Sequence, residues 1–476
     1  MSAPYLHILE EMEITDEYVS MPVSPMANYF NSTVLNVFVL GVLESEIPID
    51  DSKALPLLQH VFLPISTRFS SIMVMDKKGK KHWKQVDVSV KDHIKIPIFP
   101  TIKPLKCYDE HFNEYITKIS TEQLPQHKPL WEIHIVKYPT NNAKGTFIFK
   151  LHHSLGDGYS FMTTLLSCVQ RADNPSVPIT FPSSQGSLKS TMKSKNMLLQ
   201  KLPETFSLVK SAFEFWKSAL KGTLTAKDGY TTIRSGHEDV GFRPINVTSV
   251  SLSLDNIKEV KNKLRVSVND ALVGIIFLGI RLYMEAMNHE TSKANTTALV
   301  LLNTRKVRAY KSMKGMLSTN SEAQWGNRIY FMHVPIPELC DTNSSNPLEF
   351  VMEANKTIKK KRYSLTVPFT RLLLDLVNKI KGSQAAARYV QKTLNNASLS
   401  ISHMVGPVEQ VALANHPIKG FYFMTVGLSQ SLTVTITSYM GYLRVGFGAE
   451  KGFIDEHKLN SCFQTSMEMM LNAART

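Results

Sequence analysis

The chain has 476 residues, more than a single hydrophobic core comfortably serves, so two domains are expected. With 43% hydrophobic and 20% charged residues, its composition is that of a folded protein and excludes a disordered or repetitive chain. The 54 basic and 40 acidic residues give a net charge of +14, which suits an anionic membrane surface or a phosphorylated cofactor. Nucleic acid would also suit this charge, but no recognition motif accompanies it.

The first part of the chain, residues 1–185, is expected to form an α/β domain, in which an open sheet is layered with helices. Apolar alternation and turn residues predict, in chain order, a strand over 34–43, a helix over 52–62, a hairpin of strands over 71–75 and 82–88, and strands over 131–138 and 146–151.

Residues 186–241 are expected to connect two domains and to contain an amphipathic helix over 203–221. Pro203 suits its first turn and Gly222 its end. Apolar and polar residues each fill about half of the helical wheel. Such a helix could insert its aromatic residues into a membrane interface or pack on the protein as a crossover. The second interpretation is favoured, because ordinary surface helices show the same pattern.

The last part, residues 242–476, is expected to be a second α/β domain. Strands are predicted over 246–254, 298–303, 328–334, 421–426, 432–437 and 442–447, and helices over 255–264, 269–284, 347–362 and 457–474. The helix over 269–284 is almost wholly apolar and must be buried.

The four cysteines lie far apart without paired spacing, so neither a metal site nor a disulfide framework is expected. The first residues lack the basic-then-apolar pattern of a signal peptide. The longest clean apolar run, over 271–280, has ten residues and is too short to span a membrane. We therefore expect a protein that faces the cytosol, with only peripheral membrane contact.

Residues 151–158, with the sequence LHHSLGDG, are the most informative segment. A β-rich apolar run precedes them and a helical pattern follows. A histidine at such a junction is held by a strand and points into open space, where it can accept and return a proton near neutral pH. The alternative is a pair of solvent-facing histidines followed by a helix-entry turn at Asp157-Gly158.

HHSLGDG matches the HHxxxDG signature of CoA-dependent acyltransferases. Further landmarks resemble the plant-type branch of the wax ester synthase/diacylglycerol acyltransferase family, in the right order over most of the chain: Pro129-Leu130-Trp131, Asn269-Asp270, Trp325-Gly326-Asn327 and Gly406-Pro407. The resemblance implies an α/β (α+β) fold of two chloramphenicol-acetyltransferase-like domains, with an active-site tunnel at their interface.

The resemblance also implies roles for the central motif. His153 would be the general base, taking a proton from the acceptor alcohol and returning it to the CoA thiolate, without a covalent intermediate, metal or bound cofactor. Asp157 is expected to hold the local geometry through Arg305 or Arg328, rather than to form a His-Asp dyad.

The remaining candidates have weaker assignments. His152 is expected to orient His153 or, more simply, to fill space, and Gly158 to let the backbone turn. Asn269 could bind substrate, although capping of the following helix is favoured. Trp131 could line the substrate site and is expected to pack near the tunnel mouth. No oxyanion donor is assigned.

One position departs from the family. The family usually shows Ser-Asn before the Gly-Pro element, whereas this chain has Ser402-His403. If the family asparagine shapes the tunnel or binds substrate, His403 could alter activity or chain-length choice. If it is only a turn residue, nothing follows. His403 is not expected to be a second catalytic base.

The function implied is transfer of a fatty acyl group from acyl-CoA to a long-chain alcohol, giving a wax ester, or to diacylglycerol, giving triacylglycerol. The expected place is the cytosolic face of the endoplasmic reticulum or the plasma membrane. The alternatives are an acyltransferase for another alcohol and a non-catalytic lipid-binding or shuttling protein. Two related enzyme classes are less favoured than these. Plant secondary-metabolite acyltransferases are expected to carry a DFGWG element late in the chain, and none is present. Condensation domains share HHxxxDG, but nothing in this sequence resembles an adjoining carrier domain.

Overall fold

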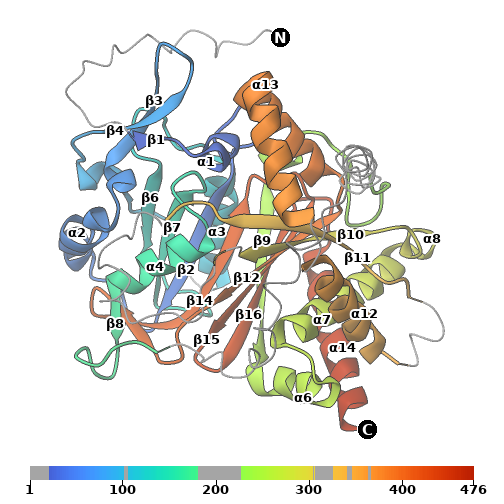
Figure 1. Ribbon diagram of the computed structural model, residues 1–476. Coiled ribbons are helices and arrows are strands. Elements are labelled where there is room, and N and C mark those ends of the chain that lie inside the picture. The colour runs from blue at the N-terminus through green and yellow to red at the C-terminus, as the bar shows by residue number, and fades with distance from the viewer. Residues whose placement is uncertain are drawn as a thin grey trace, which may run out of the picture.

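The computed structural model describes residues 21–100, 106–180, 227–303, 305, 325–339, 346–362 and 366–476. Two large β-sheets lie side by side at the centre, with helices packed around them (Figure 1). The predicted α/β architecture is thus confirmed. The amphipathic helix predicted over 203–221 lies outside the described residues.

The first large sheet has seven strands in the order β5-β6-β7-β2-β14-β13-β8. Their bounds are Ile94–Lys95 (β5), Trp131–Val136 (β6), Gly145–His152 (β7), Phe38–Ser45 (β2), His416–Val426 (β14), Val411–Leu413 (β13) and Val169–Arg171 (β8). At its centre, β2 pairs antiparallel with both β7 and β14. Every residue of β7 is buried, because helices cover both faces of the sheet there.

Two strands of this sheet, β13 and β14, come from the last quarter of the chain. The sheets therefore do not follow the expected division at residue 242, and the two halves are joined by shared strands as well as by packing. Strand pairing is set by tertiary packing, and the alternation that predicts a strand does not show which sheet it enters. The domain boundaries themselves remain a prediction.

The second large sheet has six strands in the order β11-β10-β12-β15-β16-β9. Their bounds are Ile329–Pro335 (β11), Thr297–Asn303 (β10), Leu399–Val405 (β12), Leu432–Tyr439 (β15), Tyr442–Glu450 (β16) and Ile245–Ser253 (β9). A small third sheet, ordered β1-β4-β3, contains Met21–Pro22 (β1), Lys81–Gln85 (β4) and Ser71–Met75 (β3). The last two confirm the predicted hairpin.

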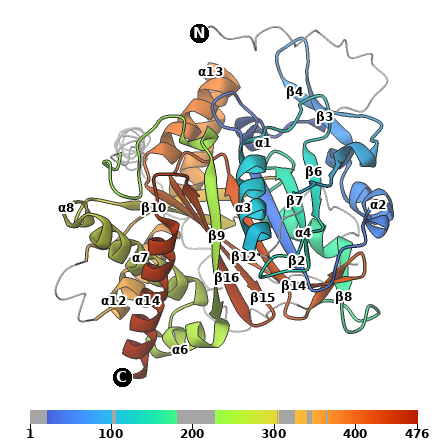
Figure 2. The same cartoon turned by 180° about the vertical axis from the view of Figure 1, so that it is seen from behind.

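Helices cover both faces of the seven-stranded sheet. Helix α3 (Lys106–Thr121) packs Phe112, Ile116 and Ile119 against one face (Figure 2). Helix α4 (Gly158–Cys168) packs Phe161 and Met162 against the other. Two shorter helices, α1 (Pro25–Phe30) and α2 (Ala54–Leu57), lie nearby, and the expected helix over 52–62 is a series of short helical turns around α2.

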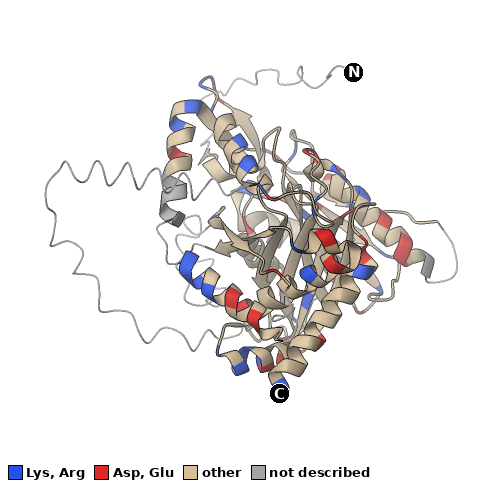
Figure 3. Cartoon of the chain, turned by 90° about the vertical axis from the view of Figure 1, so that its right-hand side faces the viewer, with Lys and Arg blue, Asp and Glu red and all other residues tan. Residues whose placement is uncertain are grey.

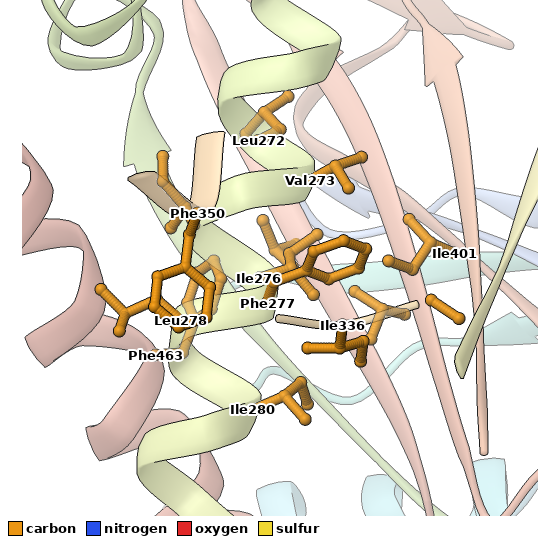
Figure 4. Packing of buried hydrophobic residues seen from close by; sticks show 14 of the residues in the cluster. Leu272, Val273, Ile276, Phe277, Leu278, Ile280, Ile336, Phe350, Ile401 and Phe463 are labelled. Atoms are coloured by element: carbon orange, nitrogen blue, oxygen red, sulfur yellow. The ribbon is translucent and has the colours of Figure 1, made fainter. Parts of the chain in front are cut away.

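Helix α7 (Val268–Met287) is the core of the second half, as its apolar sequence predicts. Figure 4 shows its side chains directed toward Ile401 of β12 on one side and toward Phe350 and Phe463 of the covering helices on the other. A Cβ at Gly274 would lie 2.6 Å from Cα of Val351, so glycine is needed for this close approach of the two helices.

The other helices of the second half are α6 (Leu254–Leu264), α8 (His289–Ser292), α12 (Leu348–Arg362), α13 (Thr366–Asn395) and α14 (Glu456–Arg475). Acidic and basic residues both occur along the helices on this side of the molecule (Figure 3). Lys359 to Arg362 occupy the last turn of α12, where they complement the negative end of the helix dipole. The sequence did not predict α3 or α13, and α13 is broken at Gly382.

Of the helices in the described ranges, none by itself has the length and apolar composition needed to cross a membrane. The bent pair α6 and α7 meets that test only when both are counted together.

Candidate active site

A cavity of about 90 Å³ lies between the two large sheets and has His153 in its wall. The first half of the chain contributes Val39 of β2, His153 and the segment from Asp157 to Tyr159. The second half contributes residues of β10, β11, β12 and β14. The site therefore lies where the two halves meet, as the resemblance implies.

His153 directly follows β7 and is held on three sides. Its backbone N–H donates to the carbonyl of Val37 at 2.8 Å, and its ring lies 4.5 Å from that of Phe30, centroid to centroid. Ring atom Nδ1 lies 2.8 Å from Oδ1 of Asn327, whose Nδ2 donates to the His153 carbonyl at 2.8 Å. Only 5% of His153 is exposed, so its orientation is fixed before substrate arrives.

The contacts of Asn327 determine the tautomer of His153. A backbone carbonyl only accepts hydrogen bonds, so the Asn327 amine must face it and the amide oxygen must face Nδ1. Nδ1 therefore carries the proton, and Nε2 has the free electron pair that a base needs. Within the described part of the chain, Nε2 has no hydrogen-bond partner. Burial lowers the pKa of His153, although the charge of Asp157 and the bond to Asn327 partly oppose this.

His152 has the opposite tautomer and faces away from the cavity. Its Nδ1 accepts from the backbone N–H of Ser154 at 3.1 Å, so its Nε2 carries the proton and donates to Oδ1 of Asn36 at 2.7 Å. Burial lowers its pKa to about 3. The expectation that it simply fills space is incomplete, because the hydrogen bond from His152 to Asn36 joins the end of β7 to the loop before β2.

Asp157 makes no hydrogen bond to His153. Its Oδ1 accepts from the backbone N–H of Ser160 and caps α4, and its Oδ2 accepts from Arg305 at 2.6 Å and from the backbone N–H of Arg328 at 2.9 Å. Of the two arginines that the sequence offered, Arg305 supplies the ion pair and Arg328 only a backbone contact. The carboxylate thereby joins the motif to the second half of the chain.

Gly158 is the first residue of α4 and lines the cavity. It does not adopt a positive φ. A Cβ at this position would lie 3.0 Å from Sδ of Met404, across the cavity wall, so its absence leaves room beside the site.

Two other candidates lie outside the cavity wall. Trp131 is fully buried, stacks on His93 and donates its Nε1–H to the carbonyl of Phe69 at 2.8 Å, so it packs the core beneath the site. Asn269 neither lines the cavity nor caps α7. The cap is Ser267, which forms a capping box with Asp270, so the capping prediction chose the wrong residue.

The role of the Trp325-Gly326-Asn327 segment was missed, although the motif was noticed. Trp325 donates its Nε1–H to the carbonyl of Leu155 at 2.8 Å, next to the contacts of Asn327 with His153. Gly326 has φ of +98°, which glycine alone adopts easily. The Trp-Gly-Asn motif is visible in the sequence, but His153, the partner of its asparagine, lies 174 residues away along the chain.

A second cavity, of about 40 Å³, adjoins the first beneath α4. It shares Val39, Met404 and Phe423 with the His153 cavity, and its other lining residues are apolar apart from Thr164. Both cavities are smaller than the roughly 300–1,000 Å³ of typical ligand sites, so a long substrate requires the lining side chains to rearrange.

Comparison with known proteins identifies the family. Residues 77–272 match the wax ester synthase/diacylglycerol acyltransferase catalytic domain, and residues 325–471 match the WS/DGAT C-terminal domain. Wax ester synthase/diacylglycerol acyltransferase 11 of Arabidopsis thaliana is 27% identical, over 94% of both chains. Wax ester synthase/diacylglycerol acyltransferase 4 of Arabidopsis thaliana is 28% identical, over 94% of this chain and 89% of that protein.

Solved structures share the fold. The wax ester synthase/diacylglycerol acyltransferase from Marinobacter aquaeolei VT8 has a TM-score of 0.58 at 16% identity, covering 95% of this chain and all of that chain. The first condensation domain of the CDA synthetase has a TM-score of 0.51 at 12% identity, covering 94% and 91%. The chain is therefore an acyltransferase and belongs to the wax ester synthase/diacylglycerol acyltransferase family.

Proposed function

We propose that the protein transfers a fatty acyl group from acyl-CoA to a long-chain alcohol or to diacylglycerol, with His153 as the general base. The observation that carries this proposal is the free electron pair on Nε2 of His153, in a cavity at the junction of the two halves. Acyl-CoA is proposed as co-substrate, without a bound cofactor.

In the proposed reaction, Nε2 removes the proton of the acceptor hydroxyl as its oxygen attacks the thioester carbonyl. The protonated ring then returns this proton to the CoA sulfur as the carbon–sulfur bond breaks. Asn327 accepts from Nδ1–H throughout, so the ring keeps its orientation while its charge changes. Substrate that fills the cavity would displace water, which would otherwise hydrolyse the thioester.

We assign the second, apolar cavity to the first carbons of the fatty acyl chain, because it adjoins the His153 cavity. Gly41 of β2 lines it, and a Cβ there would meet Cβ of Phe149 at an ordinary 3.8 Å. Gly41→Val should therefore fold and fill the cavity. We expect about a tenfold loss of kcat/KM for palmitoyl-CoA relative to octanoyl-CoA. Val42→Ile, on the opposite face of the strand, serves as control, and an equal loss with both acyl donors would contradict the assignment.

Activity should depend on pH through His153. Because burial lowers its pKa, the ring is neutral at pH 7 and becomes protonated only below its ordinary value of 6.5. We expect kcat/KM to be constant near neutral pH and to fall as pH decreases, with a midpoint below 6.5. Circular dichroism at each pH controls for unfolding. A midpoint above 6.5 would be inconsistent with this environment.

The proposal is tested by CoA release from palmitoyl-CoA in the presence of hexadecanol or diacylglycerol, with the ester product identified by mass spectrometry. Acceptor-dependent release of CoA supports the proposal and shows which alcohol is preferred. Lipid binding without CoA release would favour the alternative of a shuttling protein. Since both acceptors reside in membranes, we propose peripheral contact with the endoplasmic reticulum, which cell fractionation would test.

A further inference from the structure

The hairpin of β3 and β4 and helix α13 lie at one end of the molecule, with α1 between them (Figures 1 and 2). Both elements contact α1. The side-chain amide of Asn31, at the end of α1, donates to Sδ of Met73 in β3, and Nζ of Lys81 in β4 donates to the Asn31 carbonyl at 2.8 Å. Phe30 of α1 belongs to the same buried cluster as Ala386 of α13. The three elements therefore form one packed unit.

Helix α13 presents apolar side chains to solvent in the part that precedes its break at Gly382. On its inner face, Leu374 and Val377 pack against the buried cluster. On its outer face, Leu376 and Ile380 lie one helical turn apart and are 39% and 70% exposed. The outer face of a surface helix is normally polar, so these two side chains are placed where the core does not need them.

Lysines lie beside these apolar side chains and at the tip of the hairpin. Residues 75–80 and 375–381, which we call the basic end, contain five lysines and two aspartates, a net charge of +3. All five lysines are exposed: Lys77, Lys78, Lys80, Lys379 and Lys381. Met75, in the hairpin, is 52% exposed. Figure 3 shows basic residues at this end of the molecule, so positive charge and exposed apolar side chains occur together there.

This combination fits an anionic membrane surface better than a protein partner. Exposed apolar residues that occur singly are ordinary on a soluble protein, but here they gather with lysines on two neighbouring elements. Lysine is depleted at the centre of protein interfaces, whereas Ile380 lies between Lys379 and Lys381 in the sequence. Proteins that lie on a membrane insert apolar side chains at the headgroup boundary, while adjacent lysines meet lipid phosphates.

We propose that the basic end docks on an anionic phospholipid surface, with Met75, Leu376 and Ile380 at the headgroup boundary and the lysines on lipid phosphates. This inference deepens the proposed membrane contact and rests on the proposed function. Because the ring of Phe30 lies 4.5 Å from that of His153, α1 connects the basic end with the catalytic base. Docking by this end brings the site toward acceptors that are dissolved in the membrane.

Flotation with lipid vesicles measures docking without any reaction. We expect the unmodified protein to bind vesicles of phosphatidylcholine and phosphatidylserine about tenfold more tightly than vesicles of phosphatidylcholine alone. High salt should remove this difference, because it screens the lysines from the lipid charge. Equal binding to both kinds of vesicle, or binding to neither, would overturn the proposal.

Two variants locate the contact on the molecule. Ile380→Glu places a charge at the apolar contact and is expected to weaken binding to the anionic vesicles about tenfold. The triple variant Lys77→Gln, Lys78→Gln and Lys80→Gln is expected to weaken it about 10²-fold, because each lysine near the lipid contributes. These side chains are exposed, so the variants should fold, which circular dichroism checks. Unchanged binding in either variant would overturn the proposal.

Tyr442→Glu is the matched control, because it adds the same charge at a side chain that is 60% exposed. Strand β12 begins at Leu399, soon after the end of α13, and pairs there with the first residue of β15. Tyr442 pairs with Tyr439, the last residue of β15, and so lies at the end of the sheet away from α13. Binding should be unchanged in this control, and a loss equal to that of Ile380→Glu would overturn the proposal.

Tryptophan fluorescence tests the depth of the contact. With brominated lipids in the anionic vesicles, the signal of Ile380→Trp should be quenched more strongly than that of Tyr442→Trp, since bromine quenches only indoles at the lipid boundary. Both variants keep the four native tryptophans, so the background is the same. Equal quenching of the two variants would overturn the proposal.

Activity separates this inference from the proposed function. With octanoyl-CoA and hexanol dissolved in buffer, Ile380→Glu should release CoA at the unmodified rate, whereas with diacylglycerol held in anionic vesicles its rate should fall together with its binding. Equal losses with both acceptors would overturn the docking proposal. Absence of CoA release from the unmodified protein would refute the proposed acyl transfer, and vesicle binding would still decide on docking.

Discussion

His153→Ala is expected to lower kcat for acyl transfer by about 10²–10⁴-fold, because the acceptor alcohol then loses the base that removes its proton. Residual activity would come from substrate positioning, which the substitution leaves in place. The folded structure should persist, since the His153 ring makes a single hydrogen bond among the residues that the structure describes, to the Asn327 side chain, and its aromatic neighbours Phe30 and Phe161 stay in place. The measurement is the initial rate of CoA release at saturating palmitoyl-CoA and acceptor.

His289→Ala is the matched control for this experiment. His289 lies in α8 with 72% of its side chain exposed, and it should tolerate alanine without loss of rate. Equal rates for His153→Ala and the unmodified protein would show that His153 is not the base.

Arg305→Met is expected to destabilise the protein by about 3–5 kcal/mol, the largest stability effect we predict. Arg305 and Asp157 are 2% and 1% exposed, and their ion pair joins the two halves of the chain. Removing the guanidinium leaves a buried carboxylate without its charge partner. Urea unfolding followed by circular dichroism measures the loss.

Two further variants test the cause of this loss. Arg475→Met breaks an exposed ion pair with Glu259 and should cost less than about 1 kcal/mol. Adding Asp157→Asn to Arg305→Met removes the unpaired charge and should recover part of the stability. A loss in Arg305→Met as small as that in Arg475→Met would contradict the structural role of the buried pair.

The sequence predicted elements best where local pattern and burial agree. The apolar run over 269–284 is the buried helix α7, and alternation predicted the hairpin of β3 and β4. Helix α3 was missed although Tyr108, Phe112 and Ile116 mark one of its faces at helical spacing. Helix α13 was also missed, and a break at Gly382 interrupts its pattern.

The site was predictable in identity but not in geometry. The HHxxxDG motif indicated His153 and Asp157, because those residues lie only four positions apart in the sequence. Their partners Asn327 and Arg305 lie 174 and 148 residues away, and nothing local to either position shows that they meet. The tautomer of His153 follows from the Asn327 contact, so it too could be derived only from the folded structure.

The central claim is that His153 is a neutral base with its proton on Nδ1. Histidine ¹⁵N chemical shifts measure this directly, with the His153 signals assigned by their absence in His153→Ala. At pH 7 we predict a protonated Nδ1 and an unprotonated Nε2, a preference that Asn327→Leu should weaken. A protonated Nε2, in either a neutral or a charged ring, would contradict the claim.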